Sequence, residues 1–375
     1  MYLSDLRVRH FRNLGVQHLD LPPEGAAIVG ENAQGKTNLL EAVYYLETFR
    51  SFRGTRDDRL VAFDEDVFRV VGALKPEGGG KEVEVAAAFQ RRGRRKKVTV
   101  DGEEPRRLGE ALGRLAAVVF SPADVGMVSE GPGGRRRFLD IVLSLNVPGY
   151  LEALQTFRRI LGQRNAALKG AGAGGPVRAW DAGLAEAGAR VMVERRMWVE
   201  EWEDGFSDYF RTIAGEEEGR MRYEPDLDLE GTSSPEEVQE AYRAALAETR
   251  EREMRLGSTV VGPQRDELRL TVEEDGKELD LREYGSGGQR RTGALALRLV
   301  EAATIRQARG QEPIVLMDDV FAELDPERSR RVLDLMEREE TGQVLVTVPK
   351  ESDIRLRRES LPRWRIREGR VEASS

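Results

Sequence analysis

The sequence predicts an α/β protein in which a mixed sheet flanked by helices is interrupted by an inserted, mainly helical domain. Three observations support this fold class. A short apolar run at residues 26–29 leads into a glycine-rich loop and then a helical pattern. Fully apolar runs at 314–317 and 344–348 are typical of strands buried on both faces. Between residues 134 and 256, helical patterns dominate.

The length of 375 residues favours two or three domains, and the change of pattern along the chain places their boundaries. We expect a discontinuous α/β head at residues 1–125 and 257–375, with the helical insert at 126–256. Because no useful run of heptads crosses the insert, it is expected to be a short arm and not a long coiled coil.

Alternation, apolar runs and turn residues predict the individual elements. Residues 2–11, for example, alternate apolar and charged side chains as in a half-buried strand. The expected elements are, in chain order, strands at 2–11 and 26–29, a helix from about Lys36, a hairpin within 82–100, a strand at 118–120, helices through 134–256, two strands within 258–276, a helix at 289–309, a strand at 314–317, a helix at 326–340, a strand at 344–348 and a hairpin at 364–373.

The residues that the chain lacks limit its chemistry. It has no cysteine, which excludes disulfides, thiolate nucleophiles and cysteine-ligated metal sites. Its two histidines, His10 and His18, both lie near the start, which disfavours a catalytic triad or a histidine-rich metal site. Any chemistry must therefore rest on carboxylates, hydroxyls, lysine, arginine and backbone amides.

The net charge of −8 argues against a chain coated with positive charge, although it leaves room for a local basic patch. The start of the chain is charged and lacks the apolar segment of a signal peptide. No apolar run approaches the length of a membrane span, so we expect a cytoplasmic protein with no membrane partner.

The first motif is a phosphate-binding loop of the pattern GxxxxGKT, placed between a buried strand and a helix. Its glycines allow the backbone to wrap around phosphate groups, and the loop amides supply positive potential. Lys36 is expected to reach the β- and γ-phosphates of ATP, and the Thr37 hydroxyl to ligate Mg²⁺. The alternative is a chance glycine-rich turn. The loop comprises the expected ATP-binding residues Gly30, Glu31, Asn32, Ala33, Gln34, Gly35, Lys36 and Thr37.

The second motif is the apolar strand at 314–317 followed by two acidic residues, which is typical of a Walker B strand. Asp318, at the carboxyl end of the strand, is expected to hold Mg²⁺ through water. Asp319 is placed to polarise the attacking water as a general base. The alternative is an ordinary buried strand with a solvated acidic end.

The third motif is Ser286-Gly287-Gly288-Gln289, directly before the helix expected at 289–309. Its glycines expose a helix N-terminus, and the Ser286 hydroxyl with the free amides would form an anion site suited to a γ-phosphate. Alone the motif is weak, because a flexible loop with a helix cap gives the same pattern. Its position before the Walker B strand strengthens the functional interpretation.

These motifs in this order, with Glu323-Leu324-Asp325 after the second, resemble the ABC-type ATPases. The resemblance implies that the last segment is a D-loop, which adds Asp325 to the ATP site. It also implies that the third motif completes the ATP site of a second subunit. A P-loop ABC-type ATPase head, ATP and Mg²⁺ as cofactors and an ATP-dependent homodimer are therefore expected.

Longer blocks narrow the resemblance. Seven blocks, which span the chain from about residue 3 to 348, together resemble the RecF family: LRVRHFRNL, GENAQGKTNLLEAVYYLETFRSFRG, VVFSPADVGMV, GGRRRFLD, VGPQRDEL, YGSGGQRRTGALALRL and LMDDVFAELDPERSRR. The resemblance implies an SMC-like head and an ATP-dependent DNA-binding protein of replication and recombinational repair. It also implies binding to double-stranded DNA and gap junctions without sequence specificity, and work with RecR- and RecO-type mediators to load a recombinase.

Three positions depart from the broader ABC pattern. Ser121-Pro122 occupies the expected place of the Q-loop glutamine, and Thr347 is nearest to the place of the switch histidine. We assign Thr347 to the ATP site on this ground. Asp319 stands where Glu is more common, so its carboxylate lies farther from the water. We therefore expect slow turnover, which suits a nucleotide-gated clamp and not a motor. We also expect DNA to stimulate this weak ATPase.

Two basic clusters are candidates for contacts with DNA. No aromatic residue interleaves the first cluster, which indicates contacts with backbone phosphates and not a base-stacking platform. One lies on the expected hairpin turn and comprises Arg91, Arg92, Arg94, Arg95, Lys96 and Lys97. The other lies where the insert begins and comprises Arg135, Arg136 and Arg137. A solvated charged turn or a set of structural salt bridges is the alternative for both.

Two other functions remain open at this point. A transporter's nucleotide-binding subunit would share the ATPase motifs, but it predicts a shorter helical subdomain. An OLD-type ATPase needs an acidic nuclease module after the ATPase, and no such module precedes Ser375.

Overall fold

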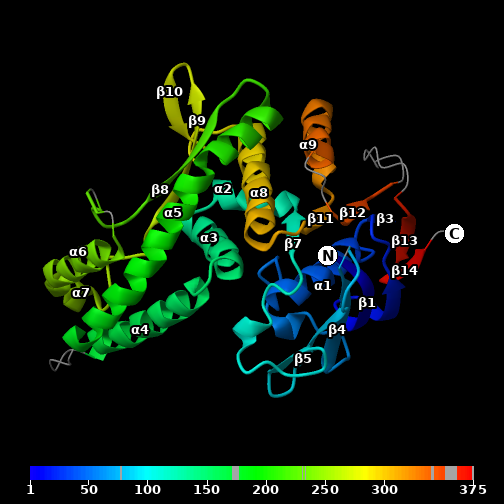
Figure 1. Cartoon of the computed structure of the whole chain (residues 1–375), viewed down its shortest axis with the longest axis horizontal. Coiled ribbons are helices and arrows are strands. Elements are labelled where there is room, and N and C mark those ends of the chain that lie inside the picture. The colour runs from blue at the N-terminus through cyan, green and yellow to red at the C-terminus, as the bar shows by residue number, and fades with distance from the viewer. Residues whose placement is uncertain are drawn as a thin grey trace. The chain divides into compact units, whose positions relative to one another are not determined.

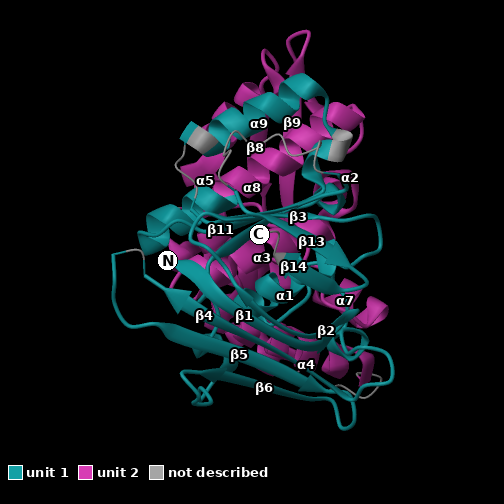
Figure 2. Ribbon diagram, turned by 90° about the vertical axis from the view of Figure 1, so that its right-hand side faces the viewer, with its two compact units in different colours: residues 1–124, 301–375 teal, residues 125–300 magenta. Residues whose placement is uncertain are grey.

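The computed structural model describes residues 1–76, 78–170, 177–229, 231–232, 234–338, 342–350 and 361–373. The chain forms two compact units, one comprising residues 1–124 and 301–375 and the other residues 125–300 (Figure 2). The first boundary lies beside the one expected from the sequence. The second lies far beyond residue 257, because the strands that follow this residue pair with a strand of the insert.

An antiparallel sheet of five strands begins the first unit, in the order β2-β1-β4-β5-β6. Figure 2 shows these strands side by side. Their inward side chains, among them Leu6, Phe68 and Val85, are fully buried, whereas the alternate side chains face outward. The strands are β1 (Tyr2–Phe11), β2 (Leu14–Asp20), β4 (Val67–Lys75), β5 (Val83–Gln90) and β6 (Arg95–Val100).

A mixed sheet of six strands completes this unit, in the order β14-β13-β3-β12-β11-β7. Its central strands are parallel, and every residue of β3, β11 and β12 is buried, as their apolar runs predicted. The strands are β3 (Gly25–Val29), β7 (Ala117–Phe120), β11 (Ile314–Asp318), β12 (Val344–Val348), β13 (Arg363–Arg367) and β14 (Arg370–Ala373).

Helix α1 (Lys36–Thr48) packs between the two sheets (Figure 1). Its side chains Leu39, Leu40 and Val43 belong to one hydrophobic core with residues of both sheets. Helix α9 (Pro326–Arg338) follows β11, and the end of the expected helix at 339–340 lies outside the described residues. Because β3, β12, β11 and β7 run parallel, their carboxyl ends meet at one edge, where ligands bind in such sheets.

The second unit is mainly helical, as expected, but it also contains a sheet. Its helices are α2 (Val125–Ser129), α3 (Pro132–Asn146), α4 (Tyr150–Gly170), α5 (Asp181–Ala214), α6 (Pro235–Glu248), α7 (Arg250–Leu256) and the first part of α8 (Gly287–Arg309). The antiparallel sheet, in the order β10-β9-β8, consists of β8 (Gly219–Glu224), β9 (Glu267–Glu274) and β10 (Lys277–Asp280).

The expectation of two strands within residues 258–276 was wrong. Only β9 lies there, and residues 258–266 form no strand. Buried polar contacts hold this segment instead, because Arg195 donates to the carbonyl oxygen of Pro263 over 2.7 Å and to Asp266 Oδ2 over 3.2 Å. Arg195 also donates to Asp140 Oδ1 over 2.8 Å, so its charge is compensated by two carboxylates.

Candidate functional site

The glycine-rich loop joins β3 to α1 at the carboxyl edge of the parallel strands. Gly35 has a φ of +112° and Ala33 a φ of +65°, so the loop turns through left-handed conformations. A Cβ on Gly30 would lie 2.6 Å from the carbonyl oxygen of Ile366, which allows no larger residue there. Glu31, Asn32 and Ala33 are exposed at the top of the loop, where a phosphate chain could reach them.

Lys36 is almost fully buried and lies along the loop. Its Nζ donates to the carbonyl oxygens of Gly30 over 2.8 Å and Glu31 over 3.2 Å. The same Nζ lies 3.7 Å from Asp319 Oδ2. The ammonium is therefore held at the phosphate loop and next to a Walker B carboxylate.

The two proposed metal ligands are in direct contact. The Thr37 hydroxyl donates to Asp318 Oδ1 over 2.8 Å, and Asp318 ends strand β11. Burial raises the pKa of Asp318 above its usual range, although the hydrogen bonds from Thr37 and Thr347 act in the opposite direction. Two hard oxygen ligands from different elements suit Mg²⁺, so the residues present fit this ion.

Asp319 follows Asp318 in a left-handed conformation, with a φ of +47°. Its backbone N–H donates to Thr347 Oγ1 over 3.1 Å. The Thr347 hydroxyl also lies 3.1 Å from Asp318 Oδ1, and the side chain is fully buried. Thr347 therefore holds the carboxylate of Asp318 and the backbone of Asp319 from the buried side of the site.

Asp325 directly precedes helix α9. Its Oδ1 accepts from the backbone N–H of Arg328 over 2.9 Å and of Glu327 over 3.0 Å. These backbone hydrogen bonds, with that of Arg328 the largest cause, lower the pKa of Asp325. The side chain of Glu323 lies outside the described residues. Ser121, at the expected Q-loop position, directly follows β7, and its backbone N–H donates to Asp124 Oδ2 over 2.8 Å.

Residues far from the loop in sequence hold its conformation. The turn between β13 and β14 contacts Gln34 twice, since Gly369 N donates to the Gln34 carbonyl oxygen over 2.8 Å and Glu368 N donates to Gln34 Oε1 over 2.6 Å. Asn13 Nδ2 donates to the same carbonyl over 3.2 Å. Sequence reasoning did not assign Asn13, Glu368 or Gly369 to the site. The sequence predicts the hairpin that contains the Glu368-Gly369 turn, but it does not indicate that this turn contacts the loop.

A second set of contacts supports α1 near its start. Arg12, in the segment FRN, donates to both carboxylate oxygens of Glu41 over 2.9 and 3.0 Å, and Glu41 is fully buried. Arg12 also donates to the Thr55 hydroxyl over 2.9 Å. These contacts tie the first strand and the segment after α1 to the helix that carries Lys36 and Thr37.

The third motif lies in the other compact unit, where it begins helix α8. Gln289 N donates to Ser286 Oγ over 3.1 Å, and Ser286 N donates to Gln289 Oε1 over 2.7 Å. This reciprocal pair is a capping box. Gly287 is exposed and Gly288 half-exposed, so the first turn of the helix remains accessible.

The basic hairpin turn divides into structural and exposed residues. Arg91 donates to the carbonyl oxygens of Val61 and Ala62, and Lys96 donates to that of Phe49 over 2.6 Å. Lys97 pairs with Glu104 over 2.7 Å. Arg92, Arg94 and Arg95 are exposed, and none forms an ion pair within the described part of the chain.

The basic cluster of the second unit divides in the same way. Arg135 is 4% exposed and forms a two-bonded ion pair with Glu267, at 2.9 Å for both bonds. Arg136 donates to the carbonyl oxygen of Asp266 over 2.7 Å. Only Arg137 is exposed. The geometry of Arg135 and Arg136 is that of residues that hold the fold.

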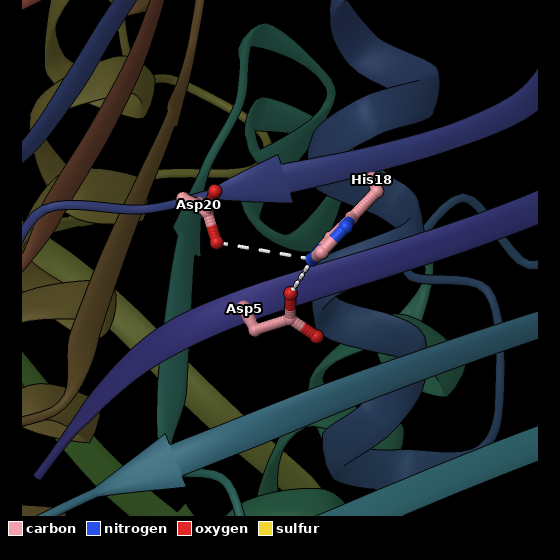
Figure 3. A group of neighbouring side chains, drawn as sticks. All are labelled: Asp5, His18 and Asp20. Atoms are coloured by element: carbon pink, nitrogen blue, oxygen red, sulfur yellow. Dashed lines mark hydrogen bonds and ion pairs between the residues drawn. The ribbon is translucent and has the colours of Figure 1, made fainter.

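Asp5, His18 and Asp20 lie close together on β1 and β2 (Figure 3). His18 Nε2 contacts Asp5 Oδ2 and lies 3.8 Å from Asp20 Oδ1. All three side chains are partly or fully exposed. Because His18 and Asp5 satisfy each other directly, we assign no metal ion to this group.

Comparisons with known proteins agree with this architecture. The model of the RecF/RecN/SMC N-terminal domain matches residues 2–361. The DNA replication and repair protein RecF of Synechococcus sp. (strain JA-2-3B'a(2-13)) is 40% identical over 354 residues, which cover 92% of this chain and 91% of that protein. This chain belongs to the RecF family. This membership favours the RecF-like ATPase expected from the sequence over a transporter subunit or an OLD-type ATPase.

Solved structures place the fold within the same family. A structure of the recombination mediator protein RecF with ATP, from the RecFOR pathway, has a TM-score of 0.89 and 31% identity, and the match covers 100% of this chain and 98% of that one. An SMC head domain from Pyrococcus furiosus has a TM-score of 0.57 at 16% identity, covering 100% of this chain and 96% of that one, which shows the likeness of fold alone. The expected SMC-like ATPase head is confirmed. Among the described helices of this RecF-family chain, none is long and apolar enough to cross a membrane.

Proposed function

We propose that this chain is an ATP-dependent DNA-binding protein of DNA replication and recombinational repair. It closes as an ATP-bridged homodimer on double-stranded or gapped DNA and hydrolyses ATP slowly. The observation that carries this proposal is the meeting of Lys36, Thr37 and the Asp318-Asp319 pair at the carboxyl edge of the parallel strands. Phosphate, metal and an attacking water all require groups at this one place.

Each of these groups has a distinct task. The loop amides and Lys36 bind the β- and γ-phosphates, which takes the lysine away from the carbonyl oxygens that it contacts now. Thr37 and Asp318 hold Mg²⁺, which neutralises phosphate charge when bound. Asp319 orients and polarises the attacking water, while Thr347 keeps the Asp318 carboxylate and the Asp319 backbone in place.

A second copy of the chain completes the site. We assign this role to Ser286, Gly287, Gly288 and Gln289, because α8 presents an accessible N-terminus whose first amides attract a γ-phosphate. The capping box already fixes the conformation of this segment before any nucleotide binds. ATP would then act as a bridge, and hydrolysis would release the dimer. Asp325, at the start of α9, contributes from the D-loop.

The DNA contact is assigned to the exposed arginines of the β5–β6 turn, namely Arg92, Arg94 and Arg95. Arginine side chains that contact phosphates bind all sequences alike. Work with RecR- and RecO-type mediators is proposed because a structural relative is described as a recombination mediator of the RecFOR pathway.

The decisive experiment is size-exclusion chromatography of Asp319→Asn with and without ATP, Mg²⁺ and duplex DNA. Because this variant retains the phosphate and metal ligands but lacks the base, it should form an ATP-dependent dimer that co-elutes with DNA. Lys36→Ala is the matched control and should remain a monomer under the same conditions. An Asp319→Asn protein that remains a monomer and binds no DNA, while it binds ATP, contradicts the proposal.

A further inference from the structure

The outward face of the five-stranded sheet carries a pair of like charges with no local partner. Arg9 on β1 and Arg69 on β4 are directly opposite each other in the strand register. Both are exposed, and neither forms an ion pair with any residue that the structure describes. Like charges in this arrangement destabilise a sheet. An anion bound between the two arginines would attract both and so offset their repulsion.

A hollow of about 520 Å³ lies at this pair. Its lining includes Arg7, Arg9, Arg69 and His18, with Val16 and Val71 among them. Arg7 is already paired with Asp5 and Glu84, and His18 with Asp5. The uncompensated charge of the hollow is therefore that of Arg9 and Arg69.

The positive charge continues from the hollow to the hairpin turn. The register aligns Arg69 with Ala88 on β5 and then with Lys97 on β6, and one row further Gln90 is opposite Arg95. Small side chains such as Ala88 leave this face open. With strands about 4.8 Å apart, the distance from β1 to β6 is about 14 Å. At about 3.4 Å per base pair, this length corresponds to about four base pairs of duplex.

Acidic residues mark the other end of the same face. Asp20, Asp5, Ala73 and Glu84 follow one another across β2, β1, β4 and β5. Asp5 and Glu84 at this end are paired with Arg7 and His18, so it carries little free positive charge, whereas the row through Arg9 and Arg69 would attract a polyanion. A polyanion that binds this face of the sheet would therefore lie along the basic row.

We propose that Arg9 and Arg69 form a phosphate-binding site for the sugar-phosphate backbone of DNA, which runs along this face to Arg92, Arg94 and Arg95. The proposal rests on the DNA binding proposed above and extends its surface from the turn to the sheet. Arginines spaced along one row of the sheet suit the regularly spaced phosphates of such a backbone. An acidic protein segment is the competing ligand, and the test separates the two.

The test measures duplex affinity across a salt series by fluorescence anisotropy, with ATP and Mg²⁺ present. For the double variant Arg9→Ala/Arg69→Ala, the slope of log K against log salt should become shallower by about 0.9 per arginine. Arg252→Ala/Arg255→Ala, which removes two exposed arginines of α7, is the control for net charge and should leave the slope unchanged. Because Arg9 and Arg69 repel each other, the double variant should melt no lower than the parent protein.

The outcomes distinguish this proposal from the function on which it rests. If the parent protein binds no duplex DNA, the proposed function itself fails. If it binds DNA and the double variant binds with the same affinity and salt slope, the sheet site is wrong and the function stands. If the double variant no longer binds a polyglutamate probe but binds duplex DNA as the parent protein does, the proposal is overturned in favour of an acidic protein ligand. Arg9→Lys/Arg69→Lys retains the charges and should keep most of the DNA affinity.

Discussion

The Thr37 hydroxyl donates to Asp318 Oδ1 over 2.8 Å, although the two residues are 281 positions apart. This contact joins the first turn of α1 to the end of β11 and brings the two motifs into one site. Both oxygens are of the kind that would hold Mg²⁺, and this hydrogen bond already keeps them together. The arrangement is thus prepared for the metal before it binds.

Thr37→Val should abolish Mg²⁺-dependent ATP binding, because the variant retains the side-chain shape but has no oxygen for the ion. Thr37→Ser retains the hydroxyl and should bind ATP within a few-fold of the parent protein. Fluorescent-nucleotide titration with and without Mg²⁺ measures this difference. Equal affinities for the two variants would remove Thr37 from the metal site.

Asp319→Asn should bind ATP and lose hydrolysis by about 100-fold, which is the lower end of the range for a general base. The substitution also removes the charge that lies 3.7 Å from Lys36 Nζ, so ATP affinity should hold or rise. Single-turnover hydrolysis and equilibrium binding report the two effects separately. A wild-type hydrolysis rate would exclude Asp319 as the base. Asp319→Glu, which extends the carboxylate, should hydrolyse at least as fast as the parent.

Asp318→Asn should raise the melting temperature at neutral pH while it eliminates ATP hydrolysis. Burial raises the pKa of Asp318, so the ionised form costs stability. Below a pH of about 3.9, the pKa of an aspartate in the unfolded chain, this cost is absent. It grows as the pH rises towards the higher pKa of Asp318 in the folded protein, and above that pKa it is complete. The stabilisation should therefore shrink on acidification. Differential scanning calorimetry across pH measures it, and an equal gain at every pH would contradict this origin.

Gly369→Ala should weaken ATP binding, although it lies outside the phosphate loop. Its φ is +77°, and a Cβ would lie 2.0 Å from the carbonyl oxygen of Asn13, so the turn must move away from Gln34. Gly276→Ala is the matched control, because Gly276 has a φ of +71° with nothing within 4 Å of its Cβ. Both variants should lose stability, but only Gly369→Ala should raise the Kd for ATP. Equal ATP affinities would show that the turn does not support the loop.

Arg135→Ala should destabilise the protein by about 3 kcal/mol, the lower end of the range for a buried pair, because it leaves the partly exposed Glu267 without its partner. Arg137→Ala, at an exposed position in the same run, should change the free energy of unfolding by less than about 0.5 kcal/mol. Urea unfolding gives both values. A marginal effect for Arg135→Ala would return this residue to the candidates for DNA contact.

The residues of the proposed ATP site could be predicted from the sequence by itself. The GxxxxGKT loop requires particular residues at particular spacings, and strands buried on both faces must be apolar throughout, so both features can be recognised from the residues alone. The same holds for Asp318 and Asp319, since a Walker B motif places its acidic residues directly after such a strand.

The tertiary structure decided which residues surround and support that site. Gln34 contacts the Glu368-Gly369 turn because β13 pairs with β3, a parallel pairing of strands that lie at opposite ends of the chain. Equally, one run of arginines contains both the buried Arg135 and the exposed Arg137, and Arg9 meets Arg69 only through the register of β1 and β4. Local pattern gives the type of a side chain, whereas its neighbours, and hence its charge balance and burial, depend on long-range pairing.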